Sequence, residues 1–168
     1  MKIVSEVMAK MIAYSNGNLH DINHLLKVHG YARTIGILEG LDVNAQKTLE
    51  VAAILHDIAC PLCREKYGNT NGRYQEIEGE KLTFEFLKSF EMGEAFVNRV
   101  AYLVGHHHTL TQIEGMDYQI LIEADYIVNA DESQHNEDKI RNVIDQLFKT
   151  SSGKALIESI YFPKKATL

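Results

Sequence analysis

The sequence predicts an all-α protein of about six to eight helices. Apolar residues recur every three or four positions along most of the chain, and no segment shows the alternation of apolar and polar residues that is typical of a strand. Proline occurs only at positions 61 and 163, so almost nothing interrupts a helical chain. With 168 residues, the chain is most simply a single domain, 1–168, and is long enough to bury a core without disulfide bonds.

The first three helices are predicted from apolar stripes at helical spacing and from residues that start or stop helices. Their boundaries are the polar segment 15–18 after the first helix, Asp21 and Gly40 for the second, and Asp42 or Asn44 to about Ala59 for the third. Pro61 and the glycines at 68 and 72 then predict a loop of about a dozen residues. A loop of that length in a compact domain is often functional.

The remaining helices follow from the same periodicity. Apolar residues at helical spacing occupy 77–87, 96–104 and 118–128, and two amphipathic segments cover about 136–149 and 152–161. These two C-terminal segments either complete the core or form the contact of a homodimer.

The charge of the chain argues against two classes of partner. A formal net charge of -6 disfavours a nucleic-acid polymer and an anionic membrane surface. A small anionic substrate remains compatible with this charge, because a bound metal reverses the local field. The N-terminal segment lacks the apolar core of a signal peptide, no apolar run approaches the ~20 residues of a membrane span, and the two cysteines fit a reduced compartment. We therefore expect a cytoplasmic protein.

Metal-ligating residue types appear in four of the predicted helices. His56 and Asp57 end the apolar run 51–55, where burial of either group is costly unless it is paired or bound to a metal. The other candidates lie in apolar helical surroundings: His24, the run 106–108 of three histidines, and Asp125 with Glu123 two positions before it. Each alone has a simpler explanation, as a core histidine, an exposed helix end or a capping carboxylate. Together they indicate a transition-metal site.

The order of these residues resembles the HD-domain metal-dependent phosphohydrolases. The resemblance spans roughly residues 18–130 and rests on His24 in "HLLKV", His56-Asp57 in "AAILHDIA" and Asp125 in "LIEADYIVN". It implies a helical HD-like core, on which the N-terminal and C-terminal helices pack. It also implies a metal held by His24, His56, Asp57 and Asp125, and so assigns Asp125 rather than Glu123.

Some branches of that family hold a second metal, and the chain matches their pattern only in part. His106 and His107 match the adjacent histidines of those branches. Gln75, four residues before Gly79, stands where they have a histidine, and His20 stands where they have an acid. The resemblance therefore implies one or two divalent ions of Mn, Fe, Co, Ni or Zn. The Gly-Tyr-Pro signature of cyclic-dinucleotide phosphodiesterases does not follow His107.

The resemblance implies hydrolysis of a small phosphoester, a nucleotide or another phosphomonoester, by a metal-activated water. Asp57, His106 and His107 are the catalytic candidates, one of the histidines being a possible general acid. The cations expected at the substrate phosphate are Lys66, Arg73 and Lys27. The alternatives are a non-catalytic sensor that binds a nucleotide or a metal in the same pocket, and a helical module whose histidines bind nothing.

Cys60 and Cys63 have the spacing of redox and zinc motifs. No second pair follows them, and the βαβ pattern of a thioredoxin-like site is missing. Two reduced thiols beside the active-site loop are the simpler interpretation. Their closeness to Asp57 raises the secondary hypothesis that oxidation inhibits the protein.

Overall fold

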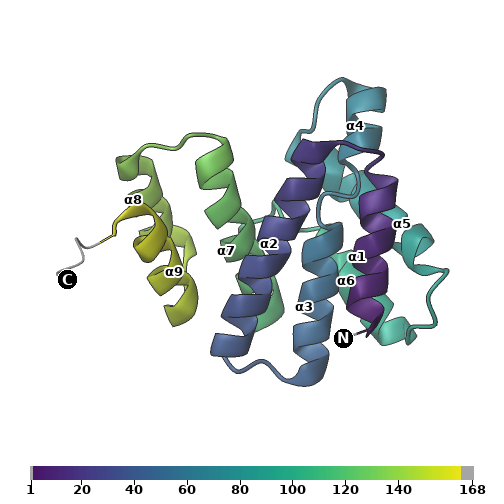
Figure 1. Ribbon diagram of the computed structural model, residues 1–168, viewed down its shortest axis with the longest axis horizontal. Helices are drawn as coiled ribbons and strands as arrows, with labels where there is room; N and C mark the ends of the chain where they lie inside the picture. The colour runs from purple at the N-terminus through teal and green to yellow at the C-terminus, as the bar shows by residue number, and fades with distance from the viewer. Residues whose placement is uncertain (1, 164–168) are drawn as a thin grey trace.

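The computed structural model describes residues 2–163, and within that range the protein is all helical (Figure 1). The predicted all-α class is confirmed. Residue 1 and residues 164–168, which belong to the predicted domain 1–168, lie outside the described residues. The helices are α1 Lys2–Tyr14, α2 Leu19–Leu38, α3 Val43–Leu55, α4 Cys60–Tyr67, α5 Gly72–Leu87, α6 Glu94–Val104, α7 Met116–Glu132, α8 Glu137–Leu147 and α9 Ser151–Tyr161.

Helix α3 lies at the centre of the fold. It packs against α1, α2, α6 and α7, and every residue from Thr48 to Leu55 is buried. Helices α2 and α7 pack on α3 and on each other, and α9 packs on both. In Figure 1, α8 and α9 lie on the opposite side of α2 and α7 from α1, α5 and α6. The C-terminal end of α3 therefore lies in the interior, among the helices that carry the other candidate ligands.

The ends of α2 and α3 differ in detail from the predicted ends. Asn18, and not Asp21, is the N-cap of α2, because its side chain accepts a hydrogen bond from the Asp21 backbone N–H (3.2 Å). Asp42 is the N-cap of α3. Helix α3 ends at Leu55 and not near Ala59, so His56 and Asp57 lie in the turn that follows.

The predicted loop after Asp57 is largely helical, and that prediction was wrong. Pro61 lies in the first turn of α4, where its missing N–H costs nothing. Gly68 ends α4 with a φ of 68°, the left-handed conformation that favours glycine. Asn71 then caps α5, so only residues 68–71 separate the two helices. The proline and the glycine therefore mark the two ends of a short helix.

Within residues 2–163, no helix combines the length and the apolar character that crossing a membrane requires.

Candidate metal centre

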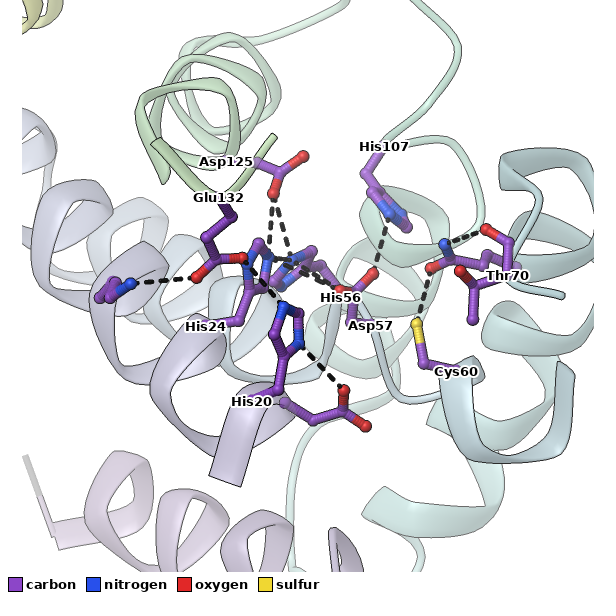
Figure 2. A network of polar contacts seen from close by, with 12 residues as sticks. His20, His24, His56, Asp57, Cys60, Thr70, His107, Asp125 and Glu132 are labelled. Carbon is purple, nitrogen blue, oxygen red and sulfur yellow. Dashed lines mark hydrogen bonds and ion pairs between the residues drawn. The ribbon is translucent and has the colours of Figure 1, made fainter. Parts of the chain in front are cut away.

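Four side chains converge at the buried end of α3. His24 comes from α2, His56 and Asp57 from the turn after α3, and Asp125 from α7 (Figure 2). The Nε2 atoms of His24 and His56 lie 3.1 Å apart, and Asp125 Oδ1 lies 3.2 Å from the first and 3.5 Å from the second. Asp57 Oδ2 lies 3.6 Å from each of the two nitrogens. Nitrogen and oxygen atoms of the kind that bind transition metals thus gather around one point.

Hydrogen bonds on the far side of each ring determine which nitrogen faces this point. His24 Nδ1 donates to Glu132 Oε2 (2.8 Å), and His56 Nδ1 donates to the Ala53 carbonyl oxygen (2.9 Å). Because a carboxylate and a carbonyl only accept, Nδ1 carries the proton in both rings. In the neutral rings, Nε2 then holds a lone pair. Two lone pairs therefore face each other beside two carboxylates.

Asp57 also lies against a second pair of histidines. Its Oδ1 is 3.6 Å from His107 Nε2, and Asp57, His107 and His108 each offer a ligand atom within 4.8 Å of the others. His107 Nδ1 donates to the Val104 carbonyl oxygen (2.8 Å). His107 Nε2 is buried and has no hydrogen-bond partner among residues 2–163. The two oxygens of Asp57 thus lie against two different groups of ligands.

The charges of the cluster shift the pKa values of its members. Burial alone would lower the pKa of His24, but its hydrogen bond to Asp125 and the charge of Asp57 raise that pKa to about 9. Burial alone would raise the pKa of Asp57, but the charge of His56 and the nearby imidazole of His107 hold that pKa well below its ordinary value. The cluster therefore keeps Asp57 ionised and, without another cation, draws a proton to His24.

The family of the protein follows from comparison with known sequences. The HD domain model matches residues 21–149, a stretch that contains every residue of both ligand groups. The chain belongs to the HD domain family. This confirms the resemblance seen in the ordered motifs, and the match continues past the predicted core of 18–130 to include α8. HD domains are generally metal-dependent hydrolases.

A solved HD structure has the same fold. It is the crystal structure of a predicted HD superfamily hydrolase from an uncultured Thermotogales bacterium, with a TM-score of 0.66 and 21% sequence identity. The similarity covers 96% of this chain and 84% of that chain. At this identity the likeness concerns the fold alone. No curated protein sequence matches the chain.

We call His24, His56, Asp57 and Asp125 the HD centre. After α6, the structure places different histidines beside Asp57 from those predicted. His106 Nδ1 donates to the Tyr102 carbonyl oxygen (2.8 Å), and its ring stacks on that of Tyr102 at a centroid distance of 4.1 Å. Among the described residues, His106 belongs to neither ligand group. The structure thus places His107 and His108 beside Asp57, and not His106 and His107. Because these histidines follow the last helical residue, Val104, helical periodicity does not predict their directions.

The first turn of α5 holds His108 in this position. The His108 backbone N–H donates to Glu76 Oε1 (3.2 Å), and a Cβ added at Gly72 would lie 2.7 Å from His108 Cγ. Gln75, which stands where some HD branches have a histidine, is buried and bonded elsewhere. It accepts from Cys60 Sγ (3.3 Å) and donates to the Thr70 carbonyl oxygen (2.9 Å). Gln75 therefore ties α4 to the 68–71 loop.

The three cations predicted at the substrate phosphate have different surroundings. Lys27 donates to Glu132 Oε1 (3.0 Å), at the edge of the HD centre. Lys66 donates to Glu78 Oε1 (2.7 Å) and is thereby tied to α5. Arg73 lies in the first turn of α5 and forms no ion pair among residues 2–163. His20, the remaining candidate ligand, is 73% exposed at its side chain and lies 3.7 Å from Glu132 Oε2.

Asp125 and Glu123 of α7 point to different faces of the helix, and only Asp125 lies in the HD centre. Glu123 is fully buried, and its Oε1 accepts hydrogen bonds from the backbone N–H groups of Lys149 (2.7 Å) and Thr150 (3.0 Å). It thus fastens the start of α9. Glu132, the partner of His24, was not among the predicted site residues, although its position seven residues after Asp125 places it on the same face of α7.

The two cysteines are poorly suited to redox chemistry. Both thiols are buried, and burial is the main cause that raises their pKa values above the ordinary value. Since the thiolate is the reactive form, these surroundings do not favour the hypothesis of oxidation sensitivity.

Proposed function

We propose that this HD domain protein hydrolyses a small phosphomonoester, with a nucleotide as the leading substrate class. The observation that supports the proposal is the geometry of the His24 and His56 Nε2 atoms, which lie 3.1 Å apart beside the carboxylates of Asp57 and Asp125. Such a gathering of ligand atoms is unfavourable unless a proton or a metal cation lies among them. The substrate class is inferred by analogy with other HD hydrolases, which act on small anionic substrates.

The donor set fits a divalent transition metal. Mixed imidazole and carboxylate ligands suit Mn, Fe, Co, Ni or Zn better than Mg. His24, His56, Asp57 and Asp125 would hold the first ion. The unpartnered His107 Nε2, together with His108 and the second oxygen of Asp57, would hold another. When bound, the metal supplies a water of lowered pKa and stabilises charge on the phosphoryl oxygens.

The side chains of the site divide the remaining tasks. In the hydrolysis, the water oxygen would bond to phosphorus and lose a proton, the bond from phosphorus to the ester oxygen would break, and that oxygen would gain a proton and leave as an alcohol. Asp57 stays ionised because its pKa is held low. Its Oδ2 faces His24 and His56, and its Oδ1 faces His107. In a two-ion enzyme His107 is a ligand. In a one-ion enzyme its raised pKa lets it give the proton to the leaving oxygen.

The test combines elemental analysis with turnover of p-nitrophenyl phosphate, bis-p-nitrophenyl phosphate and nucleoside monophosphates in Mn, Co, Ni, Fe, Zn and Mg. We expect monoester turnover with a transition metal. Asp57→Ala should lower metal content, and should lower metal affinity and turnover by more than the roughly 100-fold that loss of an outer-shell partner causes. Asp145→Ala, an exposed carboxylate of α8, is the control. The metal stoichiometry of His107→Gln, compared with that of the unsubstituted protein, distinguishes one ion from two.

Two other results would contradict the proposal in different ways. Metal-loaded protein that binds a nucleotide but hydrolyses no ester would instead be a non-catalytic sensor using the same pocket. A metal content that does not change with Asp57→Ala, or that is absent from protein purified without chelator and reloaded with each ion, would refute the metal centre itself.

A further inference from the structure

An ion pair joins two helices beside the HD centre. Arg64 of α4 donates to Asp21 of α2 through Nη2. Asp21 lies one turn before the ligand His24 and shares a face of α2 with it. Arg64 lies one turn after Cys60 and shares a face of α4 with it. The pair therefore connects the ligand-bearing face of α2 to the first turn of α4.

The helix face that carries Arg64 lies close to Asp57. The Cys60 backbone N–H donates to the Asp57 carbonyl oxygen (2.9 Å), and Cys60 Sγ donates to the buried Gln75. Burial alone would lower the pKa of Arg64, but the bond to Asp21, with a further contribution from Asp57, raises it. By geometry, Arg64 lies one helical turn after the residue whose backbone contacts Asp57, and its ion-pair partner Asp21 lies one turn before the ligand His24.

Arg64 differs from the lysines predicted at the substrate phosphate in the number of donors that its ion pair leaves unused. Lys66 is held by Glu78, and Lys27 by Glu132. Arg64 leaves 41% of its side chain exposed, while Asp21 is only 13% exposed. Its bond to Asp21 engages Nη2, and a guanidinium carries five N–H donors in a planar fork. The other donors take no part in the bond to Asp21, which holds the fork in one orientation.

We propose that Arg64 binds the phosphate group of the substrate beside the metal ligands, and that Asp21 orients its guanidinium. Arginine suits this task because its fork matches two oxygens of a phosphate at once. This inference rests on the proposed phosphohydrolase function and names the protein group that recognises the substrate.

The experiment measures binding of inorganic phosphate to the metal-loaded full chain, together with kcat and KM for p-nitrophenyl phosphate. Arg64→Ala should weaken phosphate binding roughly 10- to 100-fold, the loss expected for one charge-assisted hydrogen bond, and should raise KM. Metal content should stay unchanged. Arg64→Lys keeps the charge without the fork and should lose part of this affinity, as should Asp21→Asn.

Arg33→Ala is the matched control. Arg33 also links α2 to a neighbouring helix, through Glu50 of α3, and its side chain is 44% exposed, close to the value for Arg64. If Arg64 only fastens helices, both alanine variants should melt earlier and bind phosphate as the unsubstituted protein does. That result, with turnover intact in the unsubstituted protein, overturns the role of Arg64 and leaves the proposed function standing.

The remaining outcomes are equally decisive. If Arg64→Ala does not fold, Arg64→Lys takes its place, and phosphate affinity equal to that of the unsubstituted protein then overturns the inference. If the unsubstituted, metal-loaded protein neither binds phosphate nor hydrolyses any ester, the proposed function fails, and the inference that rests on it fails too.

Discussion

Replacing Glu132 by glutamine should weaken metal binding without unfolding the protein. Glu132 Oε2 accepts from His24 Nδ1 at 2.8 Å, and Oε1 accepts from Lys27 at 3.0 Å. The carboxylate is 15% exposed and the His24 side chain 6%, so water screens this contact only weakly. Glutamine preserves the shape of the side chain but removes the charge that keeps the proton on Nδ1 and the lone pair on Nε2.

The magnitude follows from the kind of bond that is lost. A hydrogen bond to a charged group is worth about 1.5–3 kcal/mol, which corresponds to roughly a 10- to 100-fold change in an equilibrium constant. The same range is found when outer-shell partners of metal-bound histidines are removed. We therefore expect the dissociation constant for Mn²⁺ or Zn²⁺ to rise by about that factor.

The assay is competition for the metal against a fluorescent chelator at constant pH. Glu123→Gln is the matched control, because Glu123 lies on the same helix but bonds to the start of α9. It should lower stability and leave the metal affinity of the folded protein unchanged. A Glu132→Gln protein that folds and binds metal within about twofold of the unsubstituted affinity would refute the argument that Glu132 orients His24.

Three further predictions concern stability and reactivity. Gly153→Ala should destabilise the fold by roughly 1–3 kcal/mol in urea unfolding, because its Cβ would overlap the buried carboxylate of Glu123; an unchanged midpoint would contradict this packing. The raised pKa of His24, about 9 against 6.5, stabilises the metal-free protein below pH 6.5, so its melting temperature should fall from pH 6.5 to 9, and His24→Gln should remove that fall. Neither Cys60 nor Cys63 should react with iodoacetamide in the native protein at neutral pH, and rapid labelling would show that the thiols are accessible.

Most helices were predictable because helix formation depends on periodicity and on residues at the two ends, which are local features. The segments 136–149 and 152–161 were predicted within about two residues of α8 and α9. Helix α4 was not predicted, since Pro61 and Gly68 are signals for loops as well as for helix ends. Only the packing of α4 against α5 shows which meaning applies.

The sequence by itself determined the helical class, the family and the ordered set of His24, His56, Asp57 and Asp125, because these depend on residue type and spacing. The tertiary structure decided which side chains complete the centre. It turned His108 and not His106 toward Asp57, brought Glu132 to His24, and brought Arg64 to Asp21. These contacts join residues far apart in the chain, or residues beyond a helix end, and so they depend on how the helices pack.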